Sequence, residues 1–415
     1  MARSEAAPAP AIAPAIWFDW RQGAILLSLL GLLGFFILLP IVRVLWVSLS
    51  DGEGGLTLVH FLNFFRRPLF RESLWNSLVA GLLVVFFGSL LAVPLAYLSV
   101  RYDFKGKILV NTLATLPLVI PPFVGAVALQ LLLGRSGTVN LLLMRWFDIS
   151  IPFMEGLAGV VLVQTLHFFP FIMLNTAVSL SNIDPSLEEM AQNMGCHGLR
   201  LFRRVTLPLM LPGFIAGCLL TFIRAVDDLG TPLMLNYKNL LAPQAYLRIT
   251  TIGIDDVDGY VICVILVFIS LGSLLVARKY LSLSEYATLH RAAPVARPVV
   301  GVKRAVILLF CAVVLGLSLL PHIGIVILSF AKIWSFSLLP TAYTLDNFTE
   351  ILFRAPHFVK NTLLYTVLAA ALDVFLGAII AFLLLRSQIW GRNALDALAT
   401  LPIAIPGVVR HHSRS

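Results

Sequence analysis

Three ionisable side chains, Arg224, Asp227 and Asp228, lie within a few residues of one another in an otherwise apolar stretch. Ionisable groups at membrane depth are costly unless they pair with each other or line a wet cavity. Arg224 and Asp228 are four residues apart, a spacing that places them on one face of a helix, where they can form an ion pair. A structural ion pair is one interpretation of this cluster. A gate or pathway group at the outer end of the helix is the other.

Two further polar side chains, Gln164 and His167, stand three residues apart in another apolar stretch, next to Pro170. Polar side chains in membrane helices commonly form hydrogen bonds with a neighbouring helix. We therefore expect an interhelical hydrogen bond here, with contact to a transported substrate as the alternative. The sequence contains no serine, cysteine or zinc arrangement typical of a catalytic centre, so it predicts no enzyme, no metal site and no cofactor.

A polar segment between two apolar stretches has the order of residues expected for a short helix. Asp184 suits the N-cap and Pro185 the first helical position. Glu188 and Glu189 follow early in the helix, where the helix dipole stabilises anions. Gly195 is suited to end the helix. The segment therefore predicts a helix of about two turns outside the hydrocarbon core.

This predicted helix has one apolar face, because Leu187, Ala191 and Met194 recur at helical spacing. A basic stretch follows, and then Leu207 and Pro208, which we expect to open the next apolar helix. On physical grounds alone, the helix and the basic stretch suit a position on anionic lipid headgroups.

The composition places these segments in a membrane. Of the 415 residues, 59% are hydrophobic and only 12% are charged, which is unusual for a soluble globular chain of this size. Helices of sufficient length cross about 30 Å of hydrocarbon with every backbone group bonded internally. The sequence thus predicts an all-α polytopic membrane protein with spans at about residues 24–48, 76–100, 108–134, 156–180, 207–234, 258–277, 304–330, 361–385 and 394–409.

Basic residues are concentrated in alternate loops, at residues 101–107, 181–206, 278–303 and 386–393. By the positive-inside rule these loops are cytoplasmic, and the N-terminus lies on the same side. We read the net charge of +9 as this topology signal and not as a sign of nucleic-acid binding. The predicted location is a bacterial inner membrane.

The sequence also repeats itself. Residues 76–124 align without a gap on residues 361–409, at an offset of 285 and with 16 identities. Within this match Pro117 and Pro121 correspond to Pro402 and Pro406. We expect each proline pair to kink its span, either near a pathway or as a packing feature. The chain is therefore predicted to be a tandem duplication of one membrane unit.

The duplication predicts five parts along the chain. They are a disordered cytoplasmic tail (1–22), a first six-helix unit (23–282), a cytoplasmic linker (283–302), a second unit of about three helices (303–410) and a polar tail (411–415). We expect the second copy to be incomplete through truncation at the C-terminus.

The polar segment resembles a known signature. Glu189, Ala191, Gly195 and Leu207-Pro208 match the EAA-x3-G-x9-I-x-LP pattern of binding-protein-dependent ABC importer permeases, with Met190 in place of the middle Ala and Val in place of the Ile. The resemblance implies a type I, MetI-like permease fold. It also implies that the short helix is a coupling helix, which docks on a separate nucleotide-binding subunit.

The resemblance further implies the partners of the protein. They are two ABC ATPase subunits, a periplasmic solute-binding protein, the lipid bilayer and, because the second copy is expected to be incomplete, a second permease chain. No Gly-x4-Gly-Lys-Ser/Thr phosphate loop occurs in the sequence, so ATP hydrolysis is assigned to a partner.

The string Asp-Leu-Gly-Thr-Pro, which starts at Asp228, resembles the Asp-Phe-Gly-Thr-Pro element of ferric-iron importer permeases. The best prediction is therefore a permease that translocates ferric iron. The alternatives are a permease for 2-aminoethylphosphonate, thiamine or polyamine, a secondary transporter, and a nonfunctional truncated permease.

Overall fold

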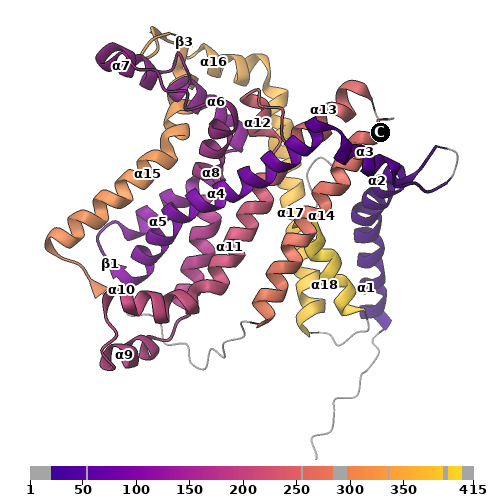
Figure 1. Cartoon of the computed structure of the whole chain (residues 1–415), viewed down its shortest axis with the longest axis horizontal. Coiled ribbons are helices and arrows are strands. Elements are labelled where there is room, and N and C mark those ends of the chain that lie inside the picture. The colour runs from indigo at the N-terminus through magenta and orange to yellow at the C-terminus, as the bar shows by residue number, and fades with distance from the viewer. Residues whose placement is uncertain are drawn as a thin grey trace, which may run out of the picture. The chain divides into compact units, whose positions relative to one another are not determined.

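The computed structural model describes residues 20–52, 55–253, 256–283, 297–334, 336–386 and 391–403. Helices form most of this part of the chain (Figure 1). Two pairs of short strands complete it, and they are β1 (Tyr102–Asp103) with β2 (Arg297–Pro298) and β3 (Ala331–Ile333) with β4 (Ala342–Tyr343). The predicted all-α class is confirmed.

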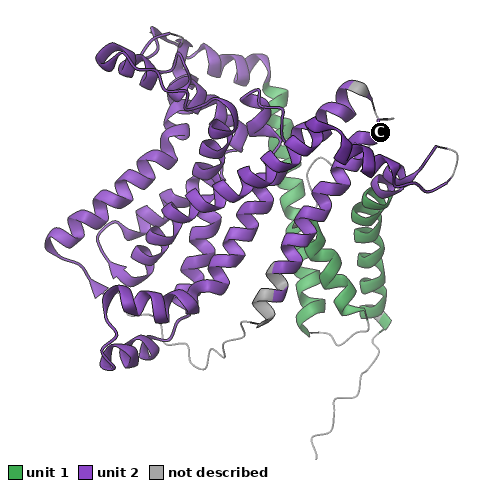
Figure 2. Ribbon diagram, viewed as in Figure 1, with its two compact units in different colours: residues 1–42, 356–403 green, residues 43–355, 404–415 purple. Residues whose placement is uncertain are grey.

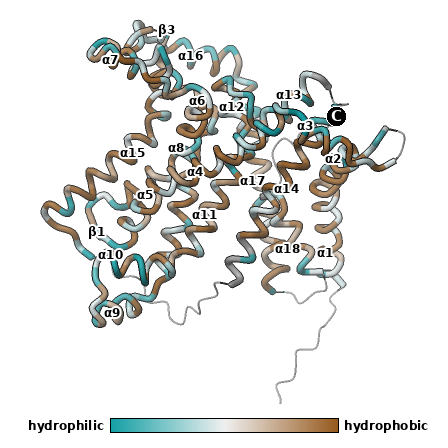
Figure 3. Tube along the Cα trace, in the orientation of Figure 1, coloured by the Kyte–Doolittle hydropathy of each residue, from teal (hydrophilic) through white to brown (hydrophobic). Residues whose placement is uncertain are grey.

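Eight helical stretches among the described residues are long and apolar enough to cross a membrane. Their apolar character extends along their length, as the brown segments of Figure 3 show. The stretches are Gln22–Leu49, Pro68–Arg101, Pro122–Phe147, Gly156–Ser181, Gly198–Asp227, Val257–Val276, Gly301–Phe330 and Pro356–Arg386.

The third predicted span is broken and not simply kinked. Helix α5 (Lys107–Thr115) runs into the 3-10 turn η2 (Leu116–Leu118), and α6 (Pro122–Leu133) begins only after a gap. Pro117 lies in the 3-10 turn and Pro121 is the N-cap of α6. Two prolines four residues apart remove two helical hydrogen-bond donors, so the helix ends where a bend was expected. Pro402 lies in the 3-10 turn η6 (Leu401–Ile403), and Pro406 lies outside the described residues.

The repeat seen in the sequence has a counterpart in local structure. Helix α4 (Pro68–Arg101) and helix α17 (Pro356–Arg386) end at residues that correspond in the alignment. Gly106 and Gly391 both follow in the left-handed region, with φ of +93° and +99°. Helix α18 (Arg392–Thr400) and η6 then have the same bounds as α5 and η2, shifted by the offset of 285.

Contacts divide the chain into two compact units, residues 1–42 with 356–403 and residues 43–355 with 404–415 (Figure 2). In the smaller unit, α1 (Trp20–Leu33) packs on α17 and α18, with Leu26, Leu29, Leu383 and Leu395 buried. Each unit therefore contains helices from both predicted copies. The domain boundaries drawn from the repeat remain a prediction.

The larger unit is built around α4, α8 (Gly156–Ser181) and α11 (Leu207–Asp227), which pack against one another. Helix α15 (Gly301–Phe330) packs on α6, and its residues Ile307, Cys311 and Val314 are buried in the same core as Leu95 of α4. By the sequence offset, α15 is equivalent to the stretch from α1 through the π-turn η1 (Gly34–Leu38) to α2 (Leu39–Leu49). In each unit, the first helix of one copy thus packs on the other copy.

Helix α14 (Val257–Leu283) is a further spanning helix of this unit. The remaining elements connect the long helices, and they are α3 (Val59–Arg66), α7 (Thr138–Phe147), α9 (Pro185–Asn193), α10 (Gly198–Leu201), η3 (Phe202–Thr206), α12 (Gly230–Met234), α13 (Leu241–Leu247), η4 (Arg248–Ile252), α16 (Asp346–Thr349) and η5 (Glu350–Arg354).

The close packing of α8 and α11 depends on Gly217. A Cβ atom at this position would lie 2.7 Å from the Cα atom of Ile172 and 3.0 Å from the carbonyl oxygen of Phe171. Small residues allow membrane helices to approach in this way. We expect Gly217→Val to destabilise the protein by about 1 to 3 kcal/mol, the usual cost of overpacking, measured by unfolding in mild detergent.

Gly272→Val is the matched control, because Gly272 lies in membrane helix α14 and has no neighbouring atom within 4 Å of a Cβ. Equal losses of stability in the two variants would contradict this account of the α8–α11 contact.

Candidate functional site

The short helix predicted from the sequence is present as α9. Asp184 caps it, since its carboxylate accepts a hydrogen bond from the backbone N–H of Ser186 at 2.9 Å. Gly195, two residues beyond the helix, has a φ of +85°, a backbone conformation that residues other than glycine rarely adopt. The local geometry of this loop is therefore set by residues within it.

The two adjacent glutamates of α9 have different roles. Glu189 is exposed, whereas the Glu188 side chain is only 11% exposed and accepts a hydrogen bond from Nη2 of Arg101 at 2.6 Å. The hydroxyl of Thr206 donates to the same Glu188 oxygen at 2.8 Å. Arg101 is the last residue of α4, and Thr206 is the last residue before α11. Glu188 thus fastens α9 to two long helices.

The outward face of α9 and the segment after it is apolar and uncovered. The exposed fraction is 88% for Met194, 72% for Leu199 and 54% for Met190. Ala191, which belongs to the predicted apolar stripe, is half-buried instead. Large apolar side chains exposed beside charged residues are typical of a surface that binds another protein.

Leu207 and Pro208 open helix α11 as expected. They do not start from a loop, because a continuous helical stretch begins at Gly198 and the π-turn η3 directly precedes Leu207. Proline lacks an N–H group, and a wide π-turn is one way for a helix to accommodate that missing donor. Leu207 is half-buried and Pro208 exposed at the start of α11.

The predicted ion pair between Arg224 and Asp228 is wrong. Helix α11 ends at Asp227, and Asp228 has extended backbone angles, so the helical spacing that supports the pair does not reach it. Arg224 is exposed and takes part in none of the ion pairs found among the described residues.

Asp228 is held by Gln164 instead. Nε2 of Gln164 donates to the Asp228 carboxylate at 3.0 Å and to the carbonyl of Ala225 at 3.2 Å. The Asp228 carboxylate also accepts the backbone N–H groups of Gly230 and Thr231, at 3.0 and 3.3 Å. The interhelical hydrogen bond predicted for Gln164 is confirmed, and Asp228 caps the short helix α12.

The other two candidate pathway residues have different contacts. Asp227 directly precedes Asp228, and the Ser270 hydroxyl of α14 donates to it at 3.4 Å. His167 contacts the ring of Phe168 edge-on, and it lines a small pocket with Pro117, Pro121 and His322. Of the five candidates, Gln164 and Asp228 are therefore the two that the structure joins by a direct side-chain hydrogen bond.

Several functional contacts were missed from the sequence. Arg101 belongs to the basic loop 101–107, and Thr206 directly precedes Leu207 of the loop signature, but the sequence predicted no contact for either residue. In the first turn of α14, Asp258 forms ion pairs with both Arg67 and Arg248. None of these pairs has the spacing of neighbours on one helix, so neither spacing nor composition predicted them.

The eight helices that are long enough to span a membrane among the described residues, with a tethered helix outside them, define a multi-pass membrane protein. The fold matches that of a chain of a bacterial ABC transporter that imports the acidic polysaccharide alginate, with a TM-score of 0.53 and 19% identity over 64% of this chain and 96% of that one. At this identity the match concerns the fold alone.

Residues 85–280 match the sequence profile of the binding-protein-dependent transport system inner membrane component family, and the chain belongs to that family of ABC importer permeases. It is 34% identical over 192 residues to a molybdenum transport system permease protein of Haemophilus influenzae, covering 45% of this chain and 82% of the relative. The resemblance inferred from the polar loop is confirmed at the level of the family.

A ferric transport system permease protein of Actinobacillus pleuropneumoniae is 28% identical over 401 residues, which is 92% of this chain. This chain spans 57% of the length of that relative.

The buried contact of Glu188 predicts a difference between the two adjacent glutamates. Glu188→Ala leaves Arg101 with an unpaired charge in a nearly buried position, so we expect a loss of about 3 kcal/mol or more in unfolding free energy. Glu189→Ala, at an exposed position on the same helix, should change it by less than about 0.5 kcal/mol. Thermal unfolding in detergent measures both, and equal effects would show that the ion pair does not hold α9.

Proposed function

We propose that this permease translocates ferric iron, delivered by a periplasmic binding protein and driven by separate ATPase subunits. The observation that carries the proposal is the extent of the ferric relative's match, which covers 92% of this chain, helices of both predicted copies included. The Asp-Leu-Gly-Thr-Pro string at Asp228 supports it, because this string resembles an element of ferric-iron importer permeases. Hydrogen bonds of Asp228 with Gln164 and Gly230 hold the string in place.

Molybdate is the second candidate substrate. It is favoured by the higher identity, 34%, to the molybdenum permease, although that match covers 45% of this chain. Uptake of radiolabelled ferric iron and of labelled molybdate, in cells with and without the intact gene, separates the two. We expect iron uptake to fall when the gene is deleted and molybdate uptake to stay unchanged. The reverse result would assign the permease to molybdate.

The ATPase is proposed to dock on the exposed face of α9, at the cytoplasmic side. Met190, Met194 and Leu199 supply uncovered apolar surface there, and Arg203 and Arg204 are exposed nearby, as the positive-inside rule expects for a cytoplasmic loop. A push on α9 reaches α4 through Arg101 and α11 through Thr206, because Glu188 binds both. A rigid element tied to two spans transmits displacement as a body.

Three changes on this face should abolish co-purification with the ATPase while leaving the fold intact. Glu189→Lys reverses an exposed charge, and Met194→Asp places a charge on a side chain that is 88% exposed. Gly195→Pro imposes a φ near −65° where the loop has +85°, so it reorients the end of the docking helix.

Glu350→Lys is the control, since it makes the same charge reversal in η5, far from α9 in the sequence. Association that survives Glu189→Lys and Met194→Asp would contradict docking at this face.

A second permease chain is a further proposed partner. Ser77, Gly81 and Val84 of α4 are among the residues buried where α4 meets α8 and α11. The equivalent positions of α17, which include Thr362 and Ala369, are exposed. We propose that helices equivalent to α8 and α11, supplied by a partner, cover this face of α17.

A further inference from the structure

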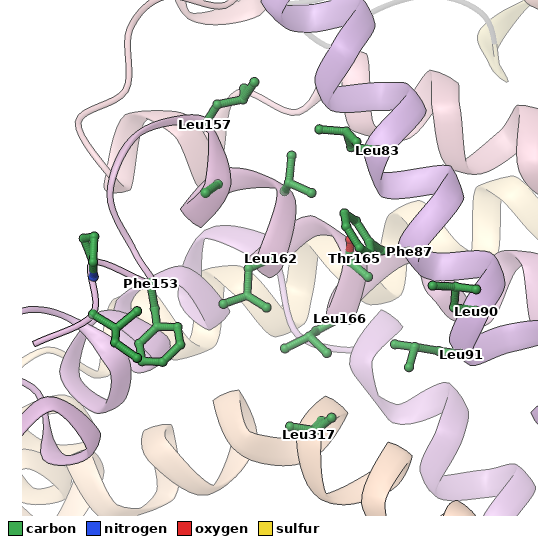
Figure 4. Close-up of a pocket in the computed structure, with 14 residues that line it drawn as sticks. Leu83, Phe87, Leu90, Leu91, Phe153, Leu157, Leu162, Thr165, Leu166 and Leu317 are labelled. Carbon is green, nitrogen blue, oxygen red and sulfur yellow. The ribbon is translucent and has the colours of Figure 1, made fainter. Parts of the chain in front are cut away.

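A large apolar cavity lies in the larger unit, and its lining includes no residue of α9 and neither Gln164 nor Asp228. Its volume is about 770 Å³, and its walls come from α4, α8, α15 and the loop at Ile151–Phe153. Figure 4 shows Leu90 and Leu91 of α4, Leu162 and Leu166 of α8 and Leu317 of α15 around it. The lining is almost entirely hydrocarbon.

The cavity is continuous with the surface that faces lipid. Phe87 and Leu90 of α4 and Leu317 of α15 line it, and their exposed fractions are 44%, 55% and 44%. All three lie in helices long and apolar enough to span a membrane, so their exposed faces meet hydrocarbon. The deeper wall is formed by Leu166 of α8, which is only 5% exposed.

The size and chemistry of the cavity restrict what can fill it. Its volume is about five times the roughly 150 Å³ of a cavity that holds benzene, which suits a long hydrocarbon chain. It could hold only about two turns of a helix 10 Å wide, too little for a transmembrane segment. An apolar lining also offers nothing to replace the hydration shell of an ion.

We propose that this cavity is a binding site for an acyl chain of a membrane phospholipid. The chain enters from the lipid-facing side and fills the space between α4, α8 and α15. A charged pair suited to the polar part of the lipid is joined to the cavity wall. Pro152 lines the cavity, and its carbonyl accepts a hydrogen bond from the backbone N–H of Glu155. The Glu155 side chain pairs with Arg135 at 2.5 Å. The lining includes none of the five candidate pathway residues, and the site does not depend on the identity of the substrate.

Photolabelling of the full chain in bilayer nanodiscs tests the proposal. The probe is phosphatidylethanolamine with a diazirine in its acyl chain, and the labelled residues are mapped by mass spectrometry. Helix α8 is the most buried of the eight spans, so lipid around the protein cannot reach its inner residues. We expect labels on Val161, Thr165 and Leu166, the buried residues of α8 that line the cavity, in addition to the outer faces of other helices.

Variants distinguish labelling inside the cavity from labelling on the lipid-facing surface of the protein. Leu162→Trp fills the cavity, and Ala158→Trp does so from an exposed position, where a larger side chain is easily tolerated. Labelling of α8 should fall by about tenfold in both, which corresponds to about 1.4 kcal/mol of binding free energy. Leu82→Trp, on an exposed part of α4 outside the cavity, should leave it unchanged.

Two results would overturn the proposal. One is labelling confined to outer faces, with none on Val161, Thr165 or Leu166. The other is undiminished α8 labelling in both cavity variants, provided that their unfolding temperatures match that of the parent protein. Native mass spectrometry of the purified chain adds a third check, since a bound mass that is not a phospholipid would assign the cavity to a different ligand.

Discussion

The buried ion pair between Arg101 and Glu188 is the interaction on which the position of α9 in this permease depends. Both side chains are only 11% exposed, so neither can lose its partner without leaving a charge in a poorly solvated place. Thr206 completes the arrangement by donating to the same carboxylate oxygen. A loop helix that would otherwise move freely is thereby fixed to α4 and α11, the two helices that also contact each other and α8 in the membrane.

Packing of apolar helices carries the rest of the structure, and it joins parts of the chain that are remote in sequence. Helix α15 contributes Cys311 and Val314 to a core built mainly from helices of the first predicted copy. Helix α1 contributes Leu26 and Leu29 to a core with α17 and α18. The equivalent contacts arise because equivalent helices carry apolar side chains at equivalent positions. Such an exchange ties both copies together more firmly than a flexible linker does.

Polar groups inside the apolar region are mostly used to hold the backbone in place. Asp228 follows the last residue of α11, where helical hydrogen bonding stops, and it accepts two backbone N–H groups that the short helix α12 leaves unpaired. Gln164 fixes the orientation of that carboxylate from a neighbouring helix. The end of α11 is therefore a rigid turn, in which the Asp228 carboxylate is held by hydrogen bonds.

The sequence by itself determined the membrane class, most of the spans, the repeat and the local turns. Asp184 as a cap and Gly195 in the loop follow from interactions over a few residues, which any short segment retains in isolation. The pairs that matter for function are longer in range, with 87 residues between Arg101 and Glu188 and 64 between Gln164 and Asp228. Which of two adjacent glutamates is buried depends on the orientation of α9 about its own axis, relative to α4 and η3. Only the tertiary structure decides that, because helical periodicity fixes relative angles along one helix and not the direction in which its neighbours lie.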